Sequence, residues 1–149
     1  MDRAQHLHAP DPRPAWAKWG TAISAAAAVF GGVTIVTAAA TLFGPQQFRT
    51  AAGSIVYFVL WFNFLAGFAY LIAAYGLFRR LRWAGGAAAA IALATSLVAL
   101  AFVVHVASGG AFSWRTPGAL ALRVAFWAAV AVAFWGHVRG GESDAQTRR

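Results

Sequence analysis

Four long runs of apolar residues, separated by short polar segments, organise the chain. They extend over residues 20–43, 51–78, 83–108 and 117–137. In a helix that rises 1.5 Å per residue, about 20 residues are enough to cross a hydrocarbon core of about 30 Å. Because unpaired backbone groups are costly in lipid, and because the alternation typical of a barrel strand is absent, each run must be a helix. The pattern predicts an all-α, polytopic membrane four-helix bundle that occupies residues 20–138.

The two ends of the chain lack this pattern. Residues 1–19 carry three prolines and mixed charges without any apolar period, so we expect a disordered tail there and a second one over residues 139–149. A basic segment precedes the first apolar run, which raises the alternative of a cleaved signal peptide. That run is longer than the apolar core of roughly 7 to 15 residues in signal peptides, so we expect it to be a retained helix.

The composition agrees with a membrane protein and narrows the chemistry. Hydrophobic residues make up 60% of the chain and charged residues 11%, with a mean hydropathy of +0.62, which is unlike a soluble domain. Cysteine is absent, which excludes disulfides, thiol catalysis and thiolate metal sites. All carboxylates lie in the tails, at Asp2, Asp11, Glu142 and Asp144. A proton-coupled exporter that needs an intramembrane carboxylate is therefore disfavoured. We also predict no catalytic residue.

The basic residues that give the chain its formal charge of +8 indicate its membrane topology. A nucleic-acid partner would need a basic face on a folded surface, whereas here the arginines punctuate apolar runs. Nine basic residues fall on one predicted side and three on the other, where Arg49, Arg115 and Arg123 lie. The positive-inside rule then places both the N-terminus and the C-terminus in the cytoplasm. The nine are Arg3, Arg13, Lys18, Arg79, Arg80, Arg82, Arg139, Arg148 and Arg149.

Two similar tripeptides precede the second and fourth apolar runs. Residues 48–50 read Phe-Arg-Thr, and residues 114–116 read Trp-Arg-Thr. In both copies we expect the threonine to cap the following helix and the arginine, Arg49 or Arg115, to contact lipid phosphates at the outer interface. The similarity of the two tripeptides is compatible with a duplicated hairpin and also with two independent outer loops of similar composition.

Small residues spaced by four predict where the helices approach one another, because close backbone contact holds helices together in lipid. One such row is Ser24, Ala28 and Gly32, and another is Gly86, Ala90 and Ala94. The abundance of alanine also allows such spacings to arise by chance. The second and fourth runs are instead rich in aromatic residues, which we interpret as lipid contact and core filling.

Polar side chains within the membrane are costly, so they are the first candidates for function. Tyr57, Asn63, His105 and Arg123 come from three predicted helices and all lie in the outer half of the bundle or at its centre. We treat them as a candidate ligand-binding set. If Arg123 faces inward, its counterion must be a lipid phosphate, a bound anion or a polar ligand, since the membrane holds no carboxylate. The alternative for Arg123 is that it snorkels to the headgroups.

The other candidates have structural alternatives of their own. Asn63 would form a hydrogen bond between helices. His105 would be a hydrogen-bonded histidine at the membrane interface. A bis-histidine haem site lacks a second histidine at matching depth, because His137 lies at the cytoplasmic end of its helix. His6 and His8 form a single HxH in a tail, too weak a signal to predict a metal.

The stretch from Phe58 to Phe126 contains WFNFLAGFAY, the RRLRWAG turn, and HVASGGAF followed by SWRT. It resembles small, uncharacterised bacterial four-helix inner-membrane proteins, similar to the DoxX-type bundles. The resemblance covers somewhat under half the chain. It implies a bacterial inner (plasma) membrane location and a four-helix architecture, and it brings no established activity or catalytic residue.

Three hypotheses for function remain open. The first is a non-enzymatic accessory or scaffold protein that associates with itself as a homo-oligomer or with a larger membrane complex, which requires only packing surfaces. The second is a binding or redox module with an outer-leaflet pocket for a quinone, a haem or an anionic lipid. The third is a transporter of a small solute, which needs a water-accessible cavity reaching Asn63. No cofactor is required by any residue pattern in the chain.

Overall fold

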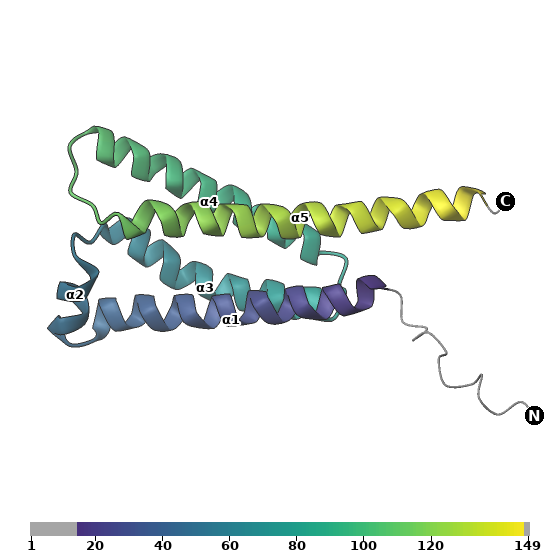
Figure 1. The fold of residues 1–149 in the computed structure, drawn as a ribbon, viewed down its shortest axis with the longest axis horizontal. Coiled ribbons are helices and arrows are strands. Elements are labelled where there is room, and N and C mark those ends of the chain that lie inside the picture. Colours follow the sequence, from purple (N-terminus) through teal and green to yellow (C-terminus); the bar gives the residue numbers. More distant parts are fainter. Residues whose placement is uncertain (1–14, 148–149) are drawn as a thin grey trace, which may run out of the picture.

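The computed structural model describes the backbone of residues 15–147 and the side chains of residues 20–135, and within this part of the chain every regular element is a helix. Four long helices and one short helix follow in the order α1 (Ala15–Phe43), α2 (Gln46–Ala52), α3 (Tyr57–Phe78), α4 (Ala84–Ala107) and α5 (Arg115–Thr147) (Figure 1). The four long helices each contain a segment long and apolar enough to cross a membrane. The prediction of an all-α four-helix membrane bundle is confirmed at this level. The segments are Gly20–Phe43, Tyr57–Phe78, Ala84–Ala107 and Arg115–Trp135.

The bundle has two distinct ends (Figure 1). The tail end holds the start of α1, the far end of α5 and the turn between α3 and α4. The α2 end holds α2, the start of α3 and the loop that joins α4 to α5. Because the chain passes along the bundle four times, both described ends of the chain lie at the tail end.

The long helices pack as two pairs, α1 with α3 and α4 with α5, and α3 and α4 join the pairs. The α1 and α3 backbones meet at Gly31 and Gly67. A Cβ atom added to Gly67 would lie 2.5 Å from Ile35 Cγ1 and 3.2 Å from the Gly31 carbonyl oxygen. Only glycine permits this approach, and close backbone contact of this kind is what stabilises helix pairs in lipid.

The two predicted rows of small residues coincide with the buried faces of the helices only in part. On α1 the buried positions are Ser24, Ala27, Gly31, Thr34 and Ala38, whereas a Cβ atom at Gly32 would meet no neighbour within 4 Å. On α4 the buried positions include Ala84, Gly85 and Ala88, while Gly86 and Ala90 are exposed. In a sequence this rich in alanine, neighbouring faces look alike, and the choice between them depends on what the partner helix presents.

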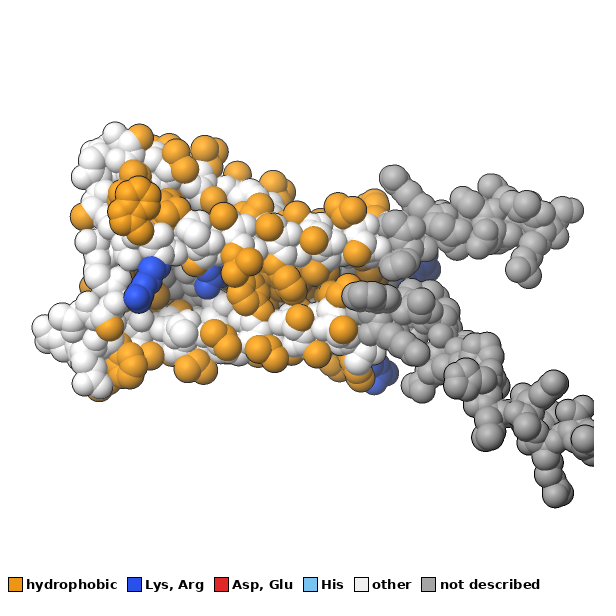
Figure 2. Space-filling model, viewed as in Figure 1, with side chains coloured by type: hydrophobic (Ala, Val, Ile, Leu, Met, Phe, Trp, Pro, Cys, Tyr) orange, Lys and Arg blue, Asp and Glu red, His pale blue; other side chains and the backbone are white. Residues whose placement is uncertain are grey.

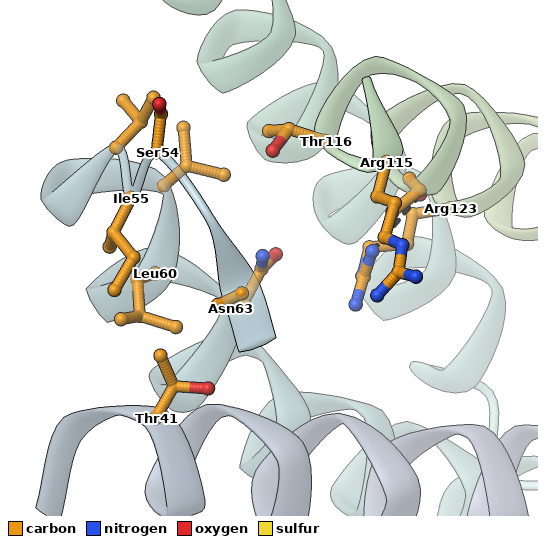
Figure 3. Close-up of a pocket in the computed structure, with 12 residues that line it drawn as sticks. Thr41, Ser54, Ile55, Leu60, Asn63, Arg115, Thr116 and Arg123 are labelled. Carbon is orange, nitrogen blue, oxygen red and sulfur yellow. Dashed lines mark hydrogen bonds between the residues drawn. The ribbon is translucent and has the colours of Figure 1, made fainter. Parts of the chain in front are cut away.

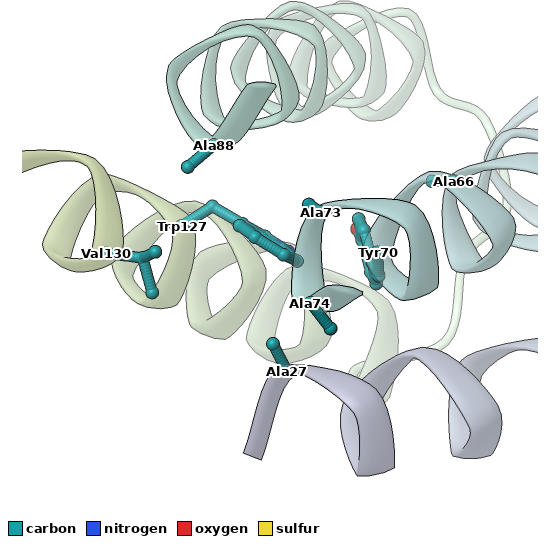
Figure 4. Close-up of a cluster of buried hydrophobic side chains, with 8 residues drawn as sticks. All are labelled: Ala27, Ala66, Tyr70, Ala73, Ala74, Ala88, Trp127 and Val130. Carbon is teal, nitrogen blue, oxygen red and sulfur yellow. The ribbon is translucent and has the colours of Figure 1, made fainter. Parts of the chain in front are cut away.

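Aromatic side chains fill the space between the two helix pairs. Tyr70 of α3 and Trp127 of α5 are fully buried, and their ring centroids lie 4.9 Å apart (Figure 4). Phe30 of α1 stacks on Tyr70 and contacts Phe126 of α5, with centroids 5.8 and 5.3 Å apart. We call Phe30, Tyr70, Phe126 and Trp127 the aromatic layer. It joins α1 and α5, whose backbones make little direct contact.

The helix boundaries differ from the predicted ones at several places. The second predicted run, 51–78, is divided by Gly53, whose φ of 74° breaks the chain between α2 and α3. Thr50 therefore does not cap the second span, because its hydroxyl donates instead to the Gln46 carbonyl within α2. The N-cap expected of Thr116 is wrong as well, since α5 already begins at Arg115. That helix continues to Thr147, past the predicted end at 137, and α1 begins at Ala15 rather than at 20.

Large apolar side chains cover the outside of the bundle (Figure 2). Val29, Leu65 and Val132 are 67%, 62% and 73% exposed, and they lie on three different helices. In water, apolar exposure of this extent on all sides would drive aggregation, whereas in a bilayer it faces a solvent of matching polarity. The surface thus agrees with the length and composition of the helices in indicating a multi-pass membrane protein.

Candidate functional site

A pocket of about 180 Å³ lies at the α2 end, between α1, α3 and α5. Side chains from α5 and α3 form facing walls, and Thr41 of α1 closes a third side (Figure 3). The segment that connects α2 to α3 forms the rim. The lining residues are Thr41, Ala52, Ser54, Ile55, Val56, Val59, Leu60, Asn63, Arg115, Thr116, Ala119 and Arg123.

Two arginines, Arg115 and Arg123, dominate the electrostatics of this pocket. They project from α5 at positions separated by about two helical turns, so both fall near one face of the helix. Figure 3 shows Asn63 of α3 on the opposite wall. No acidic residue lies between Pro12 and Gly141 in the sequence, so no carboxylate of the membrane segments can neutralise either guanidinium.

Arg123 is half-buried, and its side chain lies in the pocket, directed toward α1. Its Nη1 atom donates to the Ala119 carbonyl oxygen at 3.0 Å, so the side chain runs back along α5 toward the α2 end. Its Cζ atom lies 5.6 Å from the centroid of the Phe30 ring, a cation–π contact with α1. The Nε atom is buried and has no hydrogen-bond partner. The sequence leaves two orientations for Arg123, one toward the other helices and one toward the lipid headgroups. In the structure the side chain packs against α1.

Further buried polar atoms in this part of the bundle lack well-formed hydrogen bonds. The Tyr70 hydroxyl lies close enough to Thr95, Arg123 and Trp127 to interact with each of them. Yet neither this hydroxyl nor Trp127 Nε1 nor Asn63 Oδ1 makes a well-formed hydrogen bond. Each buried group left in this state costs about 1–3 kcal/mol. Since buried polar groups in native proteins almost always find a partner, we expect water or a ligand oxygen to accept from the Tyr70 hydroxyl and from Trp127 Nε1, and water to donate to Asn63 Oδ1.

The structure brings together only part of the candidate set. Asn63 and Arg123 line the pocket, and so does Arg115, which the sequence placed at the outer interface. Tyr57 is 60% exposed and is not among the lining residues. Arg49 lies in the last turn of α2, where its Nη2 atom donates to the Leu42 carbonyl at 3.4 Å.

His105 lies away from the pocket, at the end of α4. Its Nε2 atom is 3.4 Å from the Ala111 carbonyl oxygen, and its ring covers Gly110 so closely that a side chain there would collide with it. The edge of the ring also meets Phe58. The position indicates a role in holding the loop between α4 and α5. Among the side chains of residues 20–135 no three metal-ligating groups cluster, while His6 and His8 lie outside the described residues.

Sequence reasoning missed several polar members of the site. Tyr70 follows Asn63 by seven residues, a spacing that places both on one face of α3 and was a usable signal. Thr116 adjoins Arg115 and was interpreted as a cap. Ser54 fell inside a run assigned to a helix. Trp127 was interpreted as core filling, and nothing in the sequence distinguishes an indole that lies near an arginine from one that faces lipid.

Comparisons of the chain with known protein families, curated proteins and solved structures each found no match. The chemistry of the pocket is therefore what indicates a function. Its lining contains no histidine, cysteine or carboxylate, and so no general base beside a nucleophile. It offers guanidinium groups, an amide and hydroxyls, which together suit the recognition of an oxyanion.

Proposed function

We propose that this protein binds an oxyanion, a phosphate or a carboxylate, in the pocket at the α2 end, and that it acts as a membrane binding protein rather than as an enzyme. One observation carries the proposal: two arginines of one candidate membrane span line one pocket, in a chain whose candidate spans contain no carboxylate. An arginine at the centre of a spanning helix costs about 2.5–3.5 kcal/mol on insertion scales. A bound anion offsets that cost for Arg123 and removes the repulsion between the two cations.

The pocket supports binding better than the alternatives do. A scaffold needs only packing surfaces and gives no reason for an inward arginine. Transport needs a polar path, but in the described side chains the aromatic layer separates the pocket from the tail end, where the buried residues Ala74, Ala88 and Val130 are apolar. A neutral quinone would leave both arginine charges unpaired, and a haem gains no ligand from His105, which lies against the loop.

We propose further that the protein resides in a bacterial inner membrane with both termini in the cytoplasm, so that the α2 end and its pocket face outward. The support is the distribution of charge, since nine basic residues belong to the tail end and its flanking segments and only three to the α2 half. The resemblance to small bacterial inner-membrane proteins points the same way.

The test is thermal unfolding of the purified protein in neutral detergent, with inorganic phosphate and dioleoylphosphatidic acid as separate probes and with ionic strength held constant. A ligand that binds only the folded state raises the melting temperature. We expect at least one probe to do so for the wild type and for Arg82→Gln, an exposed arginine at the tail end. We expect neither to do so for the double variant Arg115→Gln, Arg123→Gln. Equal shifts in that double variant, or no shift in the wild type with either probe, would overturn the proposal.

A further inference from the structure

The pocket opens sideways, between α1 and α5. Its walls come from α1, α3 and α5, yet the backbones of α1 and α5 make little direct contact. Figure 2 shows that blue side chains lie in the hollow between α5 and α1 near the α2 end, where they are visible from the side of the bundle. In a membrane this side faces lipid, so a ligand can reach the arginines from the bilayer as well as from water.

The hollow changes character along its length. At the α2 end it is lined by Arg115, Arg123 and Thr41. Nearer the middle of the bundle, Phe30 and Phe126 meet across it with ring centroids 5.3 Å apart. Figure 2 shows apolar side chains, in orange, continuing between α5 and α1 beyond the blue ones. The hollow is thus cationic near the membrane surface and apolar toward the membrane centre.

A lipid in the leaflet at the α2 end has the same order of groups. Its phosphate lies at the surface, and its acyl chains run toward the membrane centre. A soluble anion matches only the first part of the hollow and leaves the apolar part facing lipid. A zwitterionic lipid matches the shape but brings its own cation, which leaves the two arginines without net neutralisation. Charge and shape together select an anionic lipid.

Resting on the proposed function, we infer that the bound oxyanion is the headgroup phosphate of an anionic phospholipid that enters from the bilayer between α1 and α5. The phosphate lies between Arg115 and Arg123, and one acyl chain runs toward the membrane centre over the half-buried rings of Phe30 and Phe126. Bidentate guanidinium contacts suit the phosphate oxygens, and the Asn63 amide on the facing wall supplies a further donor.

The test uses phosphatidic acid and phosphatidylcholine that carry the same photoreactive diazirine at the middle of one acyl chain, each added separately to protein in nanodiscs of unlabelled phosphatidylcholine. Crosslinked residues are located by peptide mass spectrometry. We expect phosphatidic acid to label residues 29–36 of α1 and residues 122–130 of α5 at least about fivefold more than phosphatidylcholine does. The double variant Arg115→Gln, Arg123→Gln should reduce labelling to the phosphatidylcholine level, and Arg82→Gln should leave it unchanged.

Two outcomes would overturn the inference. One is equal labelling by the two lipids, and the other is labelling by phosphatidic acid that persists in the double variant. Binding of glycerol 3-phosphate, which has the headgroup without the chains, separates this failure from a failure of the proposed function. If glycerol 3-phosphate binds in an arginine-dependent way while the acyl chain labels neither helix preferentially, the pocket holds an oxyanion but not a lipid. If neither probe binds, both proposals fail.

Discussion

Replacing Gly67 with alanine would test how closely α1 and α3 approach. The new Cβ atom would lie 2.5 Å from Ile35 Cγ1, 3.2 Å from the Ile35 nitrogen and 3.2 Å from the Gly31 carbonyl oxygen. Two of these three atoms belong to the α1 backbone, and isoleucine has little rotamer freedom in a helix, so the helices must move apart. Overpacking of this kind costs about 1–3 kcal/mol. The higher helix propensity of alanine relative to glycine offsets about 1 kcal/mol of this cost.

The expected net loss in the free energy of unfolding is about 1 kcal/mol, which is a change of roughly fivefold in the folding equilibrium. The assay is reversible unfolding in mixed micelles by titration with sodium dodecyl sulfate, followed by circular dichroism. Gly32→Ala is the matched control, because its Cβ atom would meet nothing within 4 Å and alanine should be neutral or stabilising there. In the background of Gly67→Ala, the variant Ile35→Ala should cost less than it does alone. If Gly67→Ala proves as stable as Gly32→Ala, the close crossing is refuted.

Three further predictions concern the pocket and the membrane topology. Tyr70→Phe should lower the free energy of unfolding by about 1 kcal/mol, because we expect the buried hydroxyl to bond to water or a ligand oxygen; an unchanged or higher free energy of unfolding would show that the hydroxyl has no such partner. His105→Ala should loosen the loop between α4 and α5 but keep oxyanion binding within about twofold of wild type, since His105 does not line the pocket; loss of binding in a folded variant would contradict its placement. Reporter tags at the two chain ends should report the same side of the membrane, and a tag inserted at Gly109 the opposite side; two ends on opposite sides would contradict four spans.

The number and approximate extent of the long helices could be predicted from the sequence because lipid imposes a simple rule. An apolar run of sufficient length must close its hydrogen bonds internally, which leaves little alternative to a spanning helix. The break at Gly53 was missed because apolar residues continue on both sides of it, so hydropathy alone shows one run. Its positive φ depends on how α2 turns at the end of the bundle, which is a tertiary property.

The candidate site was predictable where a residue was costly in lipid. Asn63 and Arg123 stood out because a polar group in a spanning helix needs a partner, and both line the pocket. The direction in which a side chain points from its helix could not be predicted in the same way. His105 lies in the last turn of α4, where the pattern places it, but its ring turns toward Ala111 in the loop. The choice between Gly31 and Gly32 also depends on the partner helix, because both are small residues in an alanine-rich segment.

The absence of cysteine from the chain permits one direct measurement of the cationic pocket. Ala119→Cys places a single thiol in the lining, and Leu97→Cys places one on α4 at a position that is 59% exposed on the apolar surface. Rates of modification by anionic and cationic methanethiosulfonate reagents are measured in detergent and normalised to the rates with free cysteine. We predict that the thiol at 119 reacts faster with the anionic reagent, that Arg115→Gln, Arg123→Gln abolishes this preference, and that the thiol at 97 reacts slowly with both. A thiol at 119 that is as unreactive as the one at 97, or that shows no preference for the anionic reagent, would contradict the existence of a cationic, ligand-accessible pocket.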